Sequence, residues 1–171
     1  MEVDQELDAF LAGEEKRAYH MAELSTRSRE EALDIIQDAM IKFVEKYANK
    51  EKTAWRPLFY RVVNSRIMDW HRRRQVRCDV THLFGDDGPD AFVSSHPYPP
   101  RDLTNVSAMK ALEYALGNLP LRQRQAVLHR LWDGMNTQET AIAMGISAGS
   151  VKTHYSRGLK SLQQRLGDHW P

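Results

Sequence analysis

Thr53 to Arg77 reads TAWRPLFYRVVNSRIMDWHRRRQVR. This stretch holds seven arginines and one acidic residue, Asp69. Apolar residues recur at helical spacing, which gathers them in one stripe and leaves the arginines on the other faces: Trp55, Leu58, Phe59, Val62, Val63, Ile67 and Trp70. Thr53 is the expected N-cap, and Pro57 must lie near the start because it has no N–H to donate. The pattern predicts a helix that is buried on one side and has a basic outer face studded with aromatic residues.

The composition of this helix indicates a nucleic-acid ligand. Arginine side chains bind phosphates, and tryptophan and tyrosine side chains stack on exposed bases, so the outer face suits a single strand. The alternative is an ordinary helix whose charges are solvated. Surface helices usually mix both signs, so an excess of seven arginines over one acidic residue favours nucleic-acid binding.

The length and composition of the chain indicate a helical protein without disulfides. Its 171 residues can form one medium domain or two small ones. Helical periodicity dominates and no sustained strand alternation occurs, which predicts an all-α fold of two small helical domains. Cys78 is the single cysteine, no signal peptide is recognisable, and no apolar run approaches membrane-spanning length. We therefore expect a cytoplasmic protein with no membrane partner.

Charge is distributed unevenly, although the net charge of the whole chain is only +1. Residues 2–51 carry 13 acids and 7 bases, a net charge of −6. Residues 53–77 carry 7 bases and 1 acid, a net charge of +6, and residues 122–166 carry 7 bases and 2 acids, a net charge of +5. An acidic segment beside two basic ones indicates two kinds of partner.

Residues 1–47 have the apolar periodicity of one or two helices, with a break at Ser25-Thr26-Arg27-Ser28. Ser28 is the expected N-cap of the second helix, with Glu30 and Glu31 in its first turn. The apolar stripe of this helix is expected at Ala32, Leu33, Ile36, Ala39, Met40, Phe43 and Val44. A carboxylate and amide face lies away from that stripe, at Asp34, Gln37 and Asp38.

Residues 78–104 have the composition of a flexible acidic linker that separates two domains, residues 1–77 and 105–171. The linker contains acids at positions 79, 86, 87, 90 and 102, one base, and several prolines. Because opposite charges lie close together in the chain, we expect a compact free form in which the linker masks the basic surfaces. A spacer whose acids only confer solubility is the alternative, and both interpretations stay open.

The second domain begins with two predicted helices. Helical periodicity resumes over residues 105–117, where Met109 belongs to the apolar set. The next helix is expected to start at Pro120, to continue through Trp132 and to stop at Gly134. We assign Trp132, like Trp55, to the core and not to a stacking surface.

A helix-turn-helix motif follows. Thr137 is the expected cap of a short helix through Met144, and the turn comprises Gly145 and a buried Ile146. Ser147 is then expected to cap a long helix from Ala148 to about Leu166.

The long helix of this motif has the features of a DNA-recognition helix. Five residues are expected to face inward, namely Val151, Tyr155, Leu159, Leu162 and Leu166. Small and basic residues form the outer surface: Gly149, Ser150, Lys152, Thr153, His154, Ser156, Arg157 and Lys160. Small residues let a helix approach base edges, and lysine and arginine bind phosphates. An ordinary helical hairpin is the alternative, but the order of cap, glycine and cap with a basic outer face favours DNA binding.

Four segments, in this order, resemble bacterial sigma factors of the extracytoplasmic-function (ECF) group. DIIQDAM at 34–40 resembles the helix that docks on the β′ clamp of RNA polymerase, and 53–77 resembles the −10 recognition and melting helix. LPLRQRQ at 119–125 resembles the opening of the C-terminal domain, and GSVKTHYSRG at 149–158 resembles the −35 recognition helix. The resemblance covers nearly the whole chain apart from the linker. Pro57 and Leu58 replace an Ala-Trp pair common in the group, and His154 stands where arginine is common.

The resemblance implies a sigma factor that has no catalytic activity, cofactor or metal of its own. Its implied partners are core RNA polymerase (the β′ clamp and the β flap), promoter DNA and, as a further partner that the group allows, an anti-sigma factor. Polymerase binding is implied for Asp34, Gln37 and Asp38. Contacts to the −10 region are implied for Lys50, Lys52, Arg56, Tyr60, Arg61, Asn64, Ser65, Asp69, Arg72 and Arg73, and contacts to −35 duplex for the eight outer residues of the long helix.

Two other classes of protein compete with this interpretation. A stand-alone helix-turn-helix regulator, which binds a palindromic operator as a dimer, accounts for residues 105–166 but leaves the arginine helix unexplained. His71, Cys78, His82 and His96 could ligate zinc, but their spacing matches no compact zinc site. No glycine-rich phosphate loop and no nucleophile with a matching base is recognisable, which argues against an enzyme.

Overall fold

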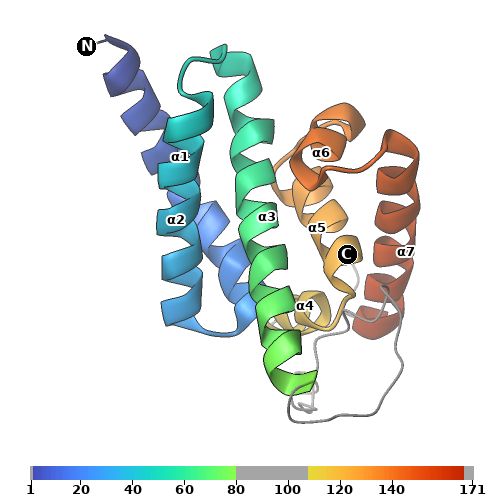
Figure 1. The fold of residues 1–171 in the computed structure, drawn as a ribbon. Helices are drawn as coiled ribbons and strands as arrows, with labels where there is room; N and C mark the ends of the chain where they lie inside the picture. Colours follow the sequence, from blue (N-terminus) through green and yellow to red (C-terminus); the bar gives the residue numbers. More distant parts are fainter. Residues whose placement is uncertain (1, 80–107, 168–171) are drawn as a thin grey trace. The chain divides into compact units, whose positions relative to one another are not determined.

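The computed structural model describes residues 2–79 and 108–167, which form helices and turns with no strand among them. This confirms the predicted all-α fold. The helices fall into two compact units, which are defined by the contacts between their Cα atoms. The first unit contains α1 (Glu2–Thr26), α2 (Arg29–Tyr47) and α3 (Lys52–Asp79). The second contains α4 (Ala108–Gly117), α5 (Leu121–Val127), η2 (Leu128–Trp132), α7 (Ala148–Leu166) and most of α6 (Thr137–Met144). Figure 1 labels the α-helices of both units.

The predicted linker falls mostly outside the described residues. Positions 80–104 are not among them, and neither are His82 and His96. The first two residues of the predicted linker, Cys78 and Asp79, instead belong to α3. Within the described ranges, no helix is long and apolar enough to cross a membrane.

The break between α1 and α2 has the predicted chemistry. Arg27 takes a left-handed backbone conformation with φ of 57°, which ends α1. Ser28 then caps α2, because its side chain accepts a hydrogen bond from the Glu31 N–H at 3.3 Å. Glu30 and Glu31 lie in the first turn, where the helix dipole favours acids.

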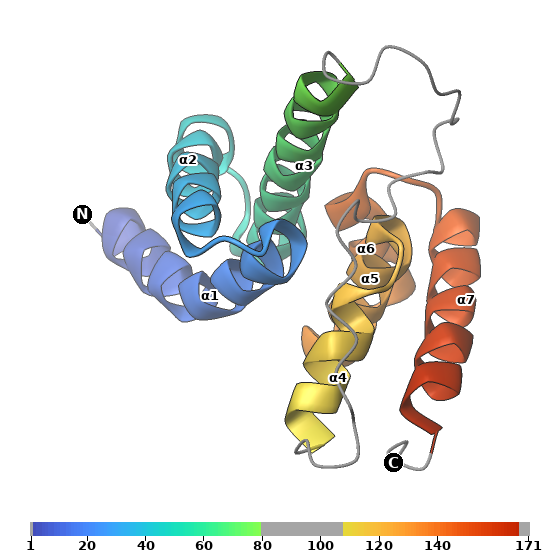
Figure 2. The same ribbon diagram turned by 90° about the horizontal axis from the view of Figure 1, so that it is seen from below.

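Aromatic rings form the centre of the first unit, in which each helix contacts the other two (Figures 1 and 2). The Phe10 ring lies 5.5 Å from that of Trp55, 5.7 Å from that of Phe43 and 5.9 Å from that of Phe59. The Phe43 and Phe59 rings lie 5.6 Å apart, edge to face, an arrangement that aromatic pairs prefer. The expectation that aromatic side chains stud the outer face of α3 is therefore wrong, because Trp55, Tyr60 and Trp70 are all buried.

The apolar stripe of α2 is rotated from the predicted one. Ile35 is buried together with Ala32, Ile36, Ala39 and Phe43. Leu33 and Val44, predicted to be core residues, are 50% and 40% exposed. The buried face of α2 is set by α1 and α3, which both pack against this helix, whereas the periodicity alone fitted either side equally well.

The start of α3 differs from the predicted one. The helix begins at Lys52, so Thr53 lies inside it and is not its N-cap. Pro57 is consequently the sixth residue of the helix, whereas a cap at Thr53 would have made it the fourth. A proline at this position leaves the Thr53 carbonyl without its usual helical donor, and Thr53 is exposed, where water can take the donor's place.

The helix-turn-helix motif of α6 and α7 has the predicted turn and the predicted second cap, but its first cap differs and Ile146 is half-buried instead of buried. Gly145 has φ of 64° and makes the turn, with Ile146 half-buried after it. Ser147 caps α7 by accepting a hydrogen bond from the Ser150 N–H at 3.1 Å. The cap of α6 is Asn136 and not Thr137, because the Asn136 Oδ1 accepts from the Glu139 N–H at 2.9 Å.

The predicted helix through Trp132 changes type at Leu128. It continues as the π-helix η2, in which the Asp133 N–H bonds to the Leu128 carbonyl five residues earlier. In this segment Trp132 is 48% exposed, and His129 is buried. The assignment of Trp132 to the core is therefore wrong, and Met109 in α4, also predicted to be apolar core, is 58% exposed.

The inner face of α7 packs tightly against α5. Four residues of α7 are buried, namely Val151, Gly158, Leu162 and Leu166. A Cβ atom at Gly158 would lie 2.7 Å from Cγ2 of Val127 and 3.1 Å from the carbonyl oxygen of Gln123. Glycine at this position therefore allows α7 to approach α5 more closely than any other residue would.

Candidate nucleic-acid interface

The outer face of α7 is open to solvent, as predicted. Lys152, Thr153, Ser156, Arg157 and Lys160 are exposed together with Gly149. The two remaining predicted contacts, Ser150 and His154, are half-buried. The face thus has small and hydroxyl residues at its N-terminal end and cations further along, which suits base edges and phosphates respectively.

The cations of α7 have no acidic partner in the described part of the chain. Lys152, Arg157 and Lys160 form no ion pair with any described residue, and α7 has no acid in its first turn. Their charge is therefore available to a polyanion, and counterion release on binding would make the affinity depend on salt concentration.

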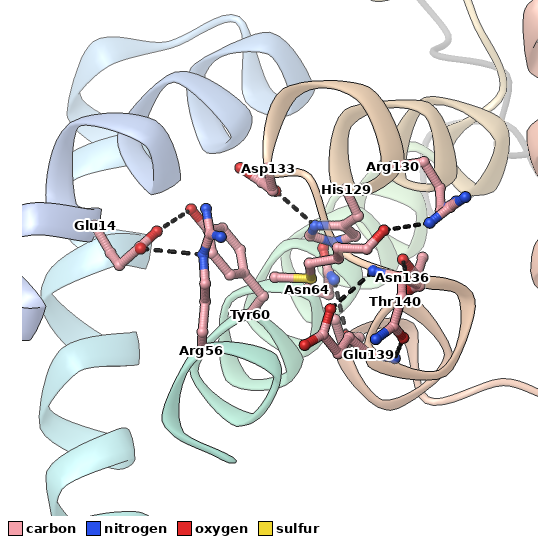
Figure 3. Close-up of polar contacts among 12 residues, drawn as sticks. Glu14, Arg56, Tyr60, Asn64, His129, Arg130, Asp133, Asn136, Glu139 and Thr140 are labelled. Atoms are coloured by element: carbon pink, nitrogen blue, oxygen red, sulfur yellow. Dashed lines mark hydrogen bonds and ion pairs between the residues drawn. The ribbon is translucent and has the colours of Figure 1, made fainter. Parts of the chain in front are cut away.

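Polar contacts fix the segment that leads into α6 (Figure 3). Nδ1 of the buried His129 lies 2.8 Å from Oδ2 of Asp133, and the Met135 N–H bonds to the His129 carbonyl at 2.9 Å. Arg130 donates to the Met135 carbonyl, and its Cζ lies 5.6 Å from the centre of the Tyr155 ring in α7. These contacts join η2, the turn before α6 and α7.

A capping box completes this segment. The Asn136 N–H donates to Oε2 of Glu139 at 2.8 Å, in return for the bond from the Glu139 N–H to Asn136. The sequence carried this signal, because Asn136 and Glu139 have the spacing of the motif. The cap was assigned to Thr137 and not to Asn136 because threonine is also a common N-cap residue.

The N-terminal part of α3 is bound to α1. Nε of Arg56 forms an ion pair with Oε1 of Glu14 at 3.1 Å, and the Tyr60 hydroxyl donates to Oε2 of the same carboxylate at 2.9 Å (Figure 3). Lys52 pairs with Glu6. Three of the predicted −10 contacts therefore bind carboxylates of α1, and Tyr60 is fully buried. Asn64 is buried as well, and Lys50 is exposed.

The middle of α3 carries a second set of ion pairs. Nε of Arg66 lies 2.7 Å from Oδ2 of Asp38 in α2, and Asp69 lies 3.7 Å from Arg66 and 3.6 Å from Arg72. Arg74 stacks over the Trp70 ring at 5.2 Å. Three of the six α3 arginines whose side chains are described, Arg56, Arg66 and Arg72, thus pair with carboxylates.

Only part of the predicted −10 surface remains open. Arg61, Ser65 and Arg73 are exposed, and neither arginine forms an ion pair with a described residue. Arg72 is also exposed, although it pairs with Asp69. The open cations of α3 therefore lie in its middle and C-terminal parts.

The exposed side of α2 combines acids with apolar residues. Asp34 and Gln37 are exposed, and Asp38 is half-buried beside Arg66. Leu33, Ile41 and Val44 are exposed on the same helix.

A groove between α1 and α2 is lined in part by Gln37, Leu33, Met40 and Tyr19. Desolvation and the hydrogen bond that its hydroxyl donates to Glu23 raise the pKa of Tyr19. Apolar residues exposed beside such a groove are typical of a protein-binding surface.

The described residues contain no group of histidine, cysteine, aspartate and glutamate that could hold a metal ion. Of the four candidate zinc ligands, only the side chain of His71 is described.

Comparison with known proteins agrees with both units. Residues 109–162 match the family model for sigma-70, region 4. The RNA polymerase sigma-E factor of Streptomyces coelicolor is 30% identical over 139 residues, which cover 80% of this chain and 72% of that protein. The ECF RNA polymerase sigma factor SigM of Mycobacterium tuberculosis is 26% identical over 161 residues, which cover 94% of this chain and 76% of SigM.

A solved structure has the same fold. It is the sigma factor RpoE from Bartonella quintana, crystallised with the anti-sigma factor NepR, and it aligns with a TM-score of 0.67 and 20% identity over 95% of each chain. The fold, the order of the four sequence segments and the sequence identity to these relatives all indicate the same family. The chain therefore belongs to the extracytoplasmic-function group of sigma-70 RNA polymerase sigma factors.

Proposed function

We propose that this sigma factor binds core RNA polymerase through α2, holds the melted −10 strand on the open part of α3 and contacts −35 duplex with α7. On this proposal, residues 1–77 form a region 2-like domain, residues 78–104 a linker and residues 105–171 a region 4-like domain. The β′ clamp and the β flap are the proposed polymerase contacts. The protein acts by binding alone, without catalysis of its own, in the cytoplasm.

The observation that carries the proposal is the outer face of α7. Its cations have no acidic partner among the described residues, its N-terminal residues are small, and Ser147 and the Asn136–Glu139 box hold the two helices of the motif. A helix with this surface can enter a major groove and bind phosphates on both sides. A stand-alone regulator is not favoured, because it leaves the basic surface of α3 and the exposed side of α2 without a role.

Run-off transcription tests the function directly. Cognate core polymerase, with and without this protein, should transcribe a genomic fragment library, and transcripts that depend on the protein identify its promoters.

Lys152→Ala with Arg157→Ala should weaken duplex binding by about tenfold and lower the salt slope by about 2. Unchanged single-strand binding in that variant is the expected control, and an equal loss on both substrates would contradict the division of labour.

Polymerase binding is tested at α2. Asp34 is exposed and forms no ion pair with a described residue, so its replacement leaves the Asp38–Arg66 pair intact. Asp34→Arg should weaken binding to core polymerase while the helix content stays constant. Core affinity equal to that of the native protein would remove α2 as the polymerase-binding element.

We also propose an anti-sigma factor as a partner, since the RpoE structure of the same fold was solved with one. Affinity capture by the full chain from its native cytoplasm, followed by mass spectrometry, tests this. Recovery of core polymerase alone would contradict it.

A further inference from the structure

Arg66 is absent from the predicted set of DNA contacts, yet it borders the open surface of α3. Arg66, Asp69 and Arg73 are spaced by three and four residues and therefore lie in one row along the helix. Arg73 is exposed, and the Arg66 side chain is 31% exposed. Arg66 is thus a cation at the edge of the surface proposed to hold the −10 strand.

The partner of Arg66 belongs to the other proposed surface. Oδ2 of Asp38 lies 2.7 Å from Nε of Arg66, while Asp69 is more distant, at 3.7 Å from Nη1. Asp38 lies one turn after Asp34 on α2, on the side proposed to bind polymerase. Its side chain is 47% exposed, so a cation of another protein can approach it.

We propose that Arg66 is a further single-strand contact and that the Asp38–Arg66 ion pair couples polymerase binding to strand binding. This rests on the proposed function. In the free protein, Asp38 holds Arg66 beside α2. A polymerase cation that pairs with Asp38 releases the guanidinium, which then binds a phosphate of the melted strand. Because coupling between two sites is reciprocal, a strand that binds Arg66 also frees Asp38 for polymerase.

The size of the effect follows from the exposure of the pair. Both side chains are partly solvated, and such ion pairs contribute little. We therefore expect a coupling of about two- to fivefold in affinity. The ion pair lowers the affinity of the free protein for the single strand but does not block the whole surface, because Arg61 and Arg73 remain exposed.

The strand arm of the test uses the full chain and a fluorescent oligothymidylate, over a range of salt concentrations. Asp38→Asn should raise affinity about two- to fivefold at low salt and steepen the salt slope by about 0.7, the value for one more phosphate contact to a single strand. Glu51→Gln is the matched control, because it removes one exposed negative charge next to α3 and Glu51 has no ion pair with a described residue. Adding Arg66→Gln to Asp38→Asn should abolish the gain. Equal gains in Asp38→Asn and Glu51→Gln would overturn the proposal, since net charge alone would then explain them.

The polymerase arm tests reciprocity. Arg66→Gln frees Asp38 and should raise affinity for core polymerase about two- to fivefold, whereas Lys46→Gln, an exposed cation on the same α2, should leave it unchanged. No gain in Arg66→Gln would overturn the coupling. The proposed function has a separate test: it is contradicted if the Asp34→Arg variant binds core polymerase as tightly as the native protein does.

Discussion

The two basic helices of this chain, α3 and α7, both carry an excess of bases in the sequence but differ in how far acids of the fold pair with those bases. On α7, Lys152, Arg157 and Lys160 face solvent without an acidic partner among the described residues. On α3, Arg56 and Arg66 are held by Glu14 and Asp38 of the two neighbouring helices. A count of charges along one helix therefore overestimates its attraction for DNA wherever neighbouring helices supply acids.

The two helices are also attached to their units by different forces. α7 is attached by close apolar packing at Gly158, whereas α3 combines an aromatic core with ion pairs to α1. Close packing tolerates no added volume, and an ion pair tolerates no loss of one partner.

The largest expected effect is at the packed helix. Gly158→Val places atoms within the van der Waals radii of Val127 and the Gln123 carbonyl, and should destabilise the second unit by about 1–3 kcal/mol. Hydrogen exchange of α5 and α7 amides in the full chain measures this loss. Gly149→Ala is the control, because its nearest atom, Oγ of Ser147, lies at 3.9 Å. Native exchange rates in Gly158→Val would show that α7 is not held by close packing.

A smaller effect is expected at the paired helix. Glu14→Gln removes the charge that binds Arg56 and weakens the bond from the buried Tyr60, at a cost of about 1–2 kcal/mol to the first unit. Glu15→Gln, at the next and exposed position, should cost almost nothing. Urea unfolding, monitored by hydrogen exchange of the amides of α1 and α3, compares the stability of the two variants. Equal stability of the two variants would mean that the ion pairs of α3 are incidental.

The smallest effect separates paired from open arginines within α3. Arg73→Ala should lower the salt slope for oligothymidylate by about 0.7, because one phosphate contact is lost. Arg56→Ala should leave the slope unchanged, because Glu14 already occupies its guanidinium. Filter binding at several salt concentrations measures both. An equal decrease in the two variants would show that α1 does not shield Arg56 from DNA.

Local signals predicted much of the fold. Ser28 and Ser147 cap the expected helices, Gly145 makes the expected turn, and the outer residues of α7 are those that periodicity placed there. Each of these features depends on a few neighbouring residues, so a single sequence carries them.

The errors have a different origin. Tyr60 was predicted to be exposed, but it is buried, and its hydroxyl donates a hydrogen bond to Glu14, 46 residues earlier in the chain. The same holds for Arg66, whose partner comes from another helix. Contacts between helices decide which of several possible faces is buried, and periodicity within one helix does not contain that information.

The π-helix Leu128–Trp132 has a consequence for how this protein can change in length. Its wide turn accommodates one residue more than an α-helix of the same height. A one-residue deletion here therefore disturbs the backbone least. Such a deletion would return the segment to α-helical periodicity and leave the orientation of the residues on either side nearly unchanged. A deletion between His129 and Asp133 would shorten the spacing of this buried pair from four residues to three. Natural variants that lack one residue here should therefore keep the apolar faces of the flanking segments and differ at the His129–Asp133 pair.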